Sequence, residues 1–171
     1  AMNGGAGDDI FLVDSTTDTV AEGAGGGTDT VQSTVGFTLT DADVENLVLL
    51  GNGNNSATGN ASANVLTGNA GNNTLNGAGG TDTASYATAT AGVAVSLALA
   101  GAQATGGAGT DTLVSIENLE GSAFGDTLTA GAGANLLSGG GGNDTLNATV
   151  DNLRDTLDRG AGPRTANSRA H

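Results

Sequence analysis

The sequence predicts an all-β solenoid, in which short parallel strands are joined by glycine-rich turns. Three observations support this fold class: a step of nine residues that recurs along the chain, 31 glycines in 171 residues, and an aromatic content of only 2%. Aromatic side chains usually supply much of the apolar area of a thick core. Here the apolar residues are mostly Ala, Val and Leu, which suits a thin core built in repeated layers.

Nonapeptide copies account for 90 of the 171 residues. Residues 50–85 hold four consecutive copies and residues 121–147 hold three, while isolated copies lie at 4–12, 24–32 and 106–114. The first half of each copy is rich in glycine, the sixth residue is Asp or Asn, and the eighth residue is mostly apolar. The sixth residues are Asp9, Asp29, Asn55, Asn64, Asn73, Asp82, Asp111, Asp126, Asn135 and Asp144.

Each copy predicts a tight turn followed by a very short strand. Glycine permits a turn with positive φ and a close approach of the backbone to a ligand. The TLx or TVx half forms the strand, and its apolar eighth residue points inward. Two nonapeptides complete one coil of 18 residues, so each turn stacks on the turn two copies away, with strands about 4.8 Å apart.

These copies resemble the GGxGxDxUx nonapeptide of the RTX (repeats-in-toxin) family. The resemblance implies a right-handed parallel β-roll that binds several calcium ions in its turns, where carbonyl and carboxylate oxygens surround each ion at about 2.4 Å. It also implies a module of a bacterial protein exported by type I secretion. The metal ligands that it implies are Asp9, Asp29, Asn64, Asp82, Asp111, Asp126, Asn135 and Asp144.

The spacing of the sixth residues ranks the expected sites. Asp126 and Asp144 are 18 residues apart, so they should face one another and form the strongest site. Asn64 and Asp82 share that spacing, and we expect a weaker shared site because Asn offers only a neutral oxygen. The alternative to a calcium site at these two residues is a structural ladder, in which asparagine side chains hydrogen-bond from coil to coil.

Other sixth residues leave more than one interpretation open. Asn55 and Asn73 are also 18 residues apart, and the ladder is the stronger interpretation for two asparagines. Asp9, Asp29 and Asp111 lack neighbours in register, so each either binds calcium together with an inserted turn or ends a loop.

The charge of the chain favours a cationic partner. The 18 acidic residues face only four basic ones, all of them Arg at position 154 or later, so residues 1–150 carry fifteen acids and no base. Such a body repels itself when compact unless a cation joins it, although an acidic surface or charge-driven disorder is the alternative. Nucleic acid and anionic membranes are poor partners. No apolar run reaches the roughly 20 residues of a membrane span.

The segments between the repeats predict longer strands that widen the solenoid. Residues 31–51 and 84–101 alternate apolar and small residues, most cleanly at Val93, Val95, Leu97 and Leu99. The tripeptide ENL precedes each nonapeptide block, at 45–47 and 117–119, which suggests two related halves. Glu45 and Glu117 resemble a carboxylate pair for glycoside chemistry, but an equivalent structural role in each half is the better interpretation.

We expect the roll to span residues 1–150, followed by a degenerate cap and a flexible polar tail at 151–171. Val150, Leu153 and Leu157 have helical spacing and predict a short capping helix. The tail does not clearly resemble a type I secretion signal. The chain begins Ala1-Met2 without a visible signal peptide, so we expect a fragment of a longer protein.

No catalytic residues are predicted. The chain has no Cys or Lys, and its one His is His171, so thiol and amine nucleophiles and His/Cys zinc sites are excluded. We expect a non-catalytic, secreted calcium-binding module that folds on calcium binding and assists a larger extracellular or cell-surface protein. The alternative is a calcium-dependent adhesin or a carbohydrate-recognition module, which would bind extracellular polysaccharide beside an enzyme or surface protein.

Overall fold

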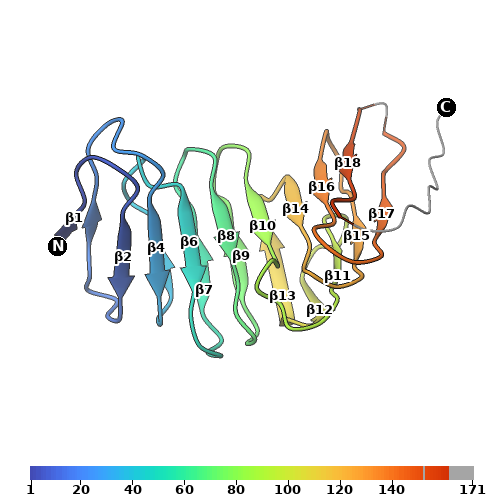
Figure 1. The fold of residues 1–171 in the computed structure, drawn as a ribbon, viewed down its shortest axis with the longest axis horizontal. Helices are drawn as coiled ribbons and strands as arrows, with labels where there is room; N and C mark the ends of the chain where they lie inside the picture. Colours follow the sequence, from blue (N-terminus) through green and yellow to red (C-terminus); the bar gives the residue numbers. More distant parts are fainter. Residues whose placement is uncertain (152, 162–171) are drawn as a thin grey trace.

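The structure is a computed structural model that describes residues 1–151 and 153–161. Every regular element within these residues is a β-strand, which confirms the all-β prediction. The strands stack side by side along the long axis of the molecule, from the N-terminus at one end to the last coil at the other (Figure 1). The fold is therefore a β-solenoid of parallel sheets, as the nine-residue step predicts.

One sheet runs the whole length of the solenoid and contains eight strands, in the spatial order β18-β16-β14-β10-β8-β6-β4-β2. Its strands are β2 (Ile10–Val13), β4 (Thr30–Ser33), β6 (Asn46–Leu49), β8 (Val65–Thr67), β10 (Thr83–Ser85), β14 (Asn118–Glu120), β16 (Leu136–Ser138) and β18 (Thr156–Asp158). All its neighbouring strands are parallel, because each is reached by a coil that returns to the same face.

The chain alternates between this sheet and three smaller sheets. The five-stranded sheet contains β5 (Phe37–Thr38), β7 (Ser56–Thr58), β9 (Thr74–Asn76), β13 (Gly109–Val114) and β12 (Ala102–Gly106). The three-stranded sheet contains β11 (Ala94–Ser96), β15 (Thr127–Thr129) and β17 (Thr145–Asn147). The first coil adds a pair made of β1 (Met2–Asn3) and β3 (Val20–Ala21).

Strand register confirms the predicted coil of 18 residues within the nonapeptide blocks. Val65 pairs with Thr83, and Thr127 pairs with Thr145, each 18 residues on. Outside the blocks the coil changes length without losing register: Ile10 pairs with Thr30, 20 residues on. Stacking of strands, rather than a fixed repeat length, therefore sets the register.

The core is a ladder of the apolar residues at the centre of the short repeat strands. The eighth residues of the repeats are buried as predicted, with Leu66, Leu75 and Leu128 each at 0% exposure, except for Leu113, which is partly buried. Leu128 lies directly over Leu146 of the next coil, and Leu66 lies over Ala84. The small residues Ala57 and Ala84 are also fully buried. Each coil thus contributes a thin apolar layer that is covered only when its neighbours are present.

The alternating segments form shorter strands than the sequence predicts. The run from Val93 to Leu99 yields only the three-residue β11, and Leu99 is 56% exposed. The chain turns away after Ser96, whose backbone N–H and carbonyl both bond the side-chain amide of Gln103. It then forms an antiparallel hairpin, β12–β13, that the sequence did not predict.

The last coil contains a strand at the place where the sequence predicts a capping helix, so that prediction is wrong. Thr156–Asp158 form β18, which pairs in parallel with β16. Val150 is 97% exposed and Leu153 is 58% exposed, so they supply no buried helical face. Asn152 and the predicted polar tail at 162–171 lie outside the described residues.

Candidate calcium sites in the glycine-rich turns

The residues that precede the strands are linked from coil to coil by a ladder of hydrogen bonds. In each link, a backbone N–H of one coil donates to a side-chain oxygen of the next coil. The backbone N–H of Asp9 donates to Asp29 Oδ1 at 2.8 Å, and that of Asn64 donates to Asp82 Oδ1 at 2.8 Å. The N–H of Asp126 donates to Asp144 Oδ1 at 3.0 Å. Each carboxylate is thereby anchored to the neighbouring coil through its first oxygen, which leaves its second oxygen free for another partner.

Five aspartates of the turns have one carboxylate oxygen that is buried and has no hydrogen-bond partner. This group consists of Asp9 Oδ2, Asp29 Oδ2, Asp82 Oδ2, Asp111 Oδ2 and Asp144 Oδ2. A buried carboxylate oxygen without a partner costs several kcal/mol because it has lost its hydration. A cation that binds there removes this cost.

Glycine keeps the space beside these oxygens open. A Cβ added at Gly77 would press against Asp82 Oδ2 and the Ser115 carbonyl oxygen. A Cβ at Gly139 would likewise press against Asp144 Oδ2. The turns thus combine carboxylate and carbonyl oxygens around a space that any side chain would fill. Such an all-oxygen set suits calcium, which accepts six to eight oxygens in flexible geometry.

A protein-family comparison matches the chain to the RTX calcium-binding nonapeptide repeat in four copies, over residues 2–20, 50–84 and 117–152. These ranges include more than half of the 171 residues. The chain belongs to the RTX calcium-binding repeat family. No curated protein matches the chain.

RTX repeats bind several calcium ions per domain, so calcium is the cofactor of this module. The unpaired oxygens and the glycine-lined spaces fit that ion. RTX repeats are structural calcium-binding elements and are typical of secreted proteins. Among the described residues no helix is present that could cross a membrane.

Glu45 and Glu117 belong to the same ladder, although neither lies in a nonapeptide copy. Glu45 Oε2 accepts the backbone N–H of Asp29 at 2.8 Å, and Glu117 Oε2 accepts that of Asp82 at 2.8 Å. This equivalence supports the structural interpretation of the two ENL segments as matching positions of two related halves. In the sequence, each Glu stands directly before an Asn-Leu strand, at the position that Asp holds before the Thr-Leu strands of the repeats.

Asparagines in the ladder turn an amide nitrogen toward the carbonyls of the neighbouring coil. Asn64 Nδ2 donates to Val44 O at 3.1 Å and Glu45 O at 3.3 Å. Asn135 Nδ2 donates to Glu117 O at 2.7 Å. In these turns the side-chain amide bonds the neighbouring coil directly. The ligand role of Asn64 and Asn135 stays a prediction.

The ladder interpretation of Asn55 and Asn73 gains support in the same way. Asn73 Nδ2 donates to Asn55 O at 3.2 Å and to Gly53 O at 3.3 Å. Its own N–H donates to Asp111 Oδ1 at 2.8 Å, across a gap of 38 residues. Asp111 thus has a stacked neighbour that its isolated motif did not reveal.

Asp126 and Asp144 face one another as their spacing predicts, but they differ in what they can offer an ion. Asp126 Oδ1 accepts hydrogen bonds from the Val93 N–H and the Ser122 hydroxyl, and its Oδ2 accepts the Ser122 N–H at 2.6 Å. Both of its oxygens are therefore already bonded. Asp144 Oδ2 is the unpaired oxygen of this pair.

Burial raises the pKa of three carboxyl groups that retain an unpaired oxygen, those of Asp82, Asp111 and Asp144. It raises the pKa of Asp82 and of Asp144 above the ordinary value, and the nearby Glu117 and Asp126 charges add to the effect. It raises the pKa of Asp111 to about 6. A raised folded-state pKa means that the folded calcium-free chain loses stability as pH rises from about 4 toward 6. A cation at the same oxygens counters that loss.

Asp111 lies in a different environment from the other carboxylates. It is fully buried and lies close to the buried Tyr86 hydroxyl, whose pKa is raised by burial and by the Asp111 charge. No glycine Cβ would press against its unpaired oxygen. Asp111 thus shares the buried unpaired oxygen of Asp82 and Asp144 but not the glycine-lined space beside it.

Proposed function

We propose that this RTX module is non-catalytic, that it folds when it meets calcium after export, and that it stabilises a larger secreted protein. One observation carries the proposal: carboxylate oxygens are buried without partners in a body that lacks basic residues before Arg154. Neither Lys nor Arg from that part of the chain can neutralise them. Calcium supplies the missing positive charge.

Calcium binding and folding are coupled in this arrangement, because ligands from successive coils meet only in the stacked solenoid. An ion that binds only the folded form adds about 2.7 kcal/mol of stability per site at 100 times its dissociation constant. In the calcium-poor cytosol the acidic chain repels itself, which keeps it loosely packed for export. Outside the cell, millimolar calcium closes the coils.

Circular dichroism and thermal denaturation test this proposal on the same chain in EDTA and in calcium. We expect a gain of β-sheet signal and a rise in melting temperature when calcium is added. Potassium chloride of equal ionic strength serves as the control, because simple screening of the acidic surface would raise stability without calcium. An equal spectrum and melting temperature in EDTA and in calcium would refute the proposal.

A further inference from the structure

The first coil departs from the pattern of the repeat turns. In a repeat turn, a Cβ added at Gly59 would meet the sixth-residue side chain and also the carbonyl oxygen of Gly77, one coil on, at 2.7 Å. At the equivalent Gly4, a Cβ would meet Asp9 Oδ2 at 2.6 Å and Glu22 Oε2. A glutamate carboxylate therefore lies where the stacked glycine carbonyl lies in the repeats.

Contacts on several sides hold Glu22 in this position. Its Oε1 accepts the backbone N–H of Gly5 at 2.7 Å and that of Gly23 at 3.0 Å. Its own N–H donates to Asp41 Oδ2 at 2.9 Å, which ties it to the next coil. Glu22 Oε2 is buried and has no hydrogen-bond partner. The Glu22 side chain is thus held in place through Oε1, and its Oε2 is available to bind an ion.

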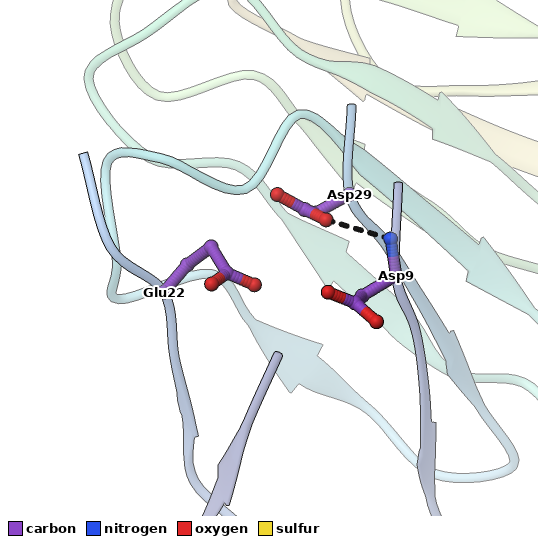
Figure 2. A group of neighbouring side chains, drawn as sticks. All are labelled: Asp9, Glu22 and Asp29. Atoms are coloured by element: carbon purple, nitrogen blue, oxygen red, sulfur yellow. Dashed lines mark hydrogen bonds between the residues drawn. The ribbon is translucent and has the colours of Figure 1, made fainter. Parts of the chain in front are cut away.

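Three carboxylates meet at this point. Asp9, Glu22 and Asp29 each offer an oxygen, and these oxygens lie within 4.8 Å of one another. Figure 2 shows the three side chains converging from separate segments of the chain. Asp29 is 0% exposed, and its Oδ2 is buried without a hydrogen-bond partner. Three anions this close repel one another strongly unless a cation lies between them.

We infer that Glu22 completes a three-carboxylate calcium site with Asp9 and Asp29 in the first coil. This inference rests on the proposed calcium-driven function, and it adds a ligand from outside the nonapeptide repeat. Calcium affinity rises with the number of charged ligands and with the rigidity of the site. This site therefore fills at lower calcium concentration than the repeat turns, and it holds the first coil against the rest of the solenoid.

Glu22→Gln tests the inference, because it keeps the shape of the side chain and removes its charge. Calcium binding is measured by calorimetry on the full chain, and the Gly5 and Gly23 amides are followed by NMR. We expect the tightest binding step of the parent chain to weaken by about tenfold or more. Asp14→Asn is the matched control: it removes the same charge from an exposed residue of the same coil and leaves that step unchanged.

Gly4→Ala blocks the same site without changing the charge, since its Cβ would fall against Asp9 Oδ2 and Glu22 Oε2. Gly79→Ala is its control, because it lies in a turn outside this site and a Cβ there would be 4.0 Å from its nearest atom, Ala61 Cα. Loss of the tight step in Glu22→Gln and Gly4→Ala, with both controls unchanged, supports the site. Unaltered calcium binding in both variants overturns it while leaving the module's calcium binding intact. A parent chain that binds no calcium would instead refute the proposed function.

Discussion

Asn64→Asp is expected to make the middle of the solenoid depend on calcium. In EDTA, we expect the free energy of unfolding to fall by about 3–5 kcal/mol, which is typical of an uncompensated buried charge. The amide of Asn64 donates to Val44 O and Glu45 O, and Asp would place a carboxylate oxygen against the same two carbonyls. The new charge would also lie beside Asp82, which already bonds the Asn64 N–H.

Calcium should recover much of this loss, because the new carboxylate and the two carbonyls together form an oxygen ligand set. Urea denaturation in EDTA and in saturating calcium measures both values. Asn52→Asp is the control, since it introduces the same charge at an exposed position and should change stability little in either medium. An equal loss for Asn64→Asp with and without calcium would show that the amide does not replace an ion.

Gly77→Ala is expected to remove one calcium site and to destabilise the calcium-bound chain. Its Cβ would press against the Ser115 carbonyl oxygen and lie 2.7 Å from Asp82 Cβ. The Ser115 oxygen belongs to the backbone, so the neighbouring coil must shift. Overpacking of this kind costs about 1–3 kcal/mol, and the lost ion adds to it. Calorimetry should count one calcium fewer, and the melting temperature in calcium should fall.

Gly79→Ala is the matched control for this substitution, two residues along the same turn. A Cβ there would lie 4.0 Å from the nearest atom, Ala61 Cα, which is ordinary contact. We expect this variant to bind the same number of ions as the parent chain. If Gly77→Ala also kept the full number of ions and its melting temperature, the space beside Asp82 Oδ2 would not be a calcium site.

The repeated part of the fold could be predicted from the sequence because its determinants are local. A glycine-rich half and a Thr-Leu half recur every nine residues, so the turn, the strand and the inward Leu66 or Leu128 follow from one short pattern. The 18-residue coil follows from the same step, and the pairing of Thr127 with Thr145 confirms it.

The insertions could not be predicted in the same way, because stacking sets their register. Asp111 bonds the N–H of Asn73 across 38 residues, and Glu117 bonds that of Asp82 across 35 residues. Spacing in the sequence says nothing about such pairs. Glu22 was missed for this reason, since it lies outside every nonapeptide copy and reaches Asp9 only through the longer first coil.

Hydrogen-bond saturation was also invisible in the sequence. Asp126 and Asp144 have equivalent motifs. Ser122 and Val93 donate hydrogen bonds to both carboxylate oxygens of Asp126, whereas Asp144 keeps one oxygen without a hydrogen-bond partner. Leu157 shows a related limit. Its helical spacing with Leu153 predicted a helix, but stacking on β16 makes its segment a strand.

We propose that calcium binds the unpaired carboxylate oxygens between stacked turns and that an amide takes its place where asparagine precedes the strand. An anomalous difference map from crystals of the chain grown in calcium would locate the ions. We expect an ion beside Asp82 Oδ2 and another beside Asp144 Oδ2, and none between Asn55 and Asn73. Turns without an ion at both aspartates, or an ion at the two asparagines, would contradict it.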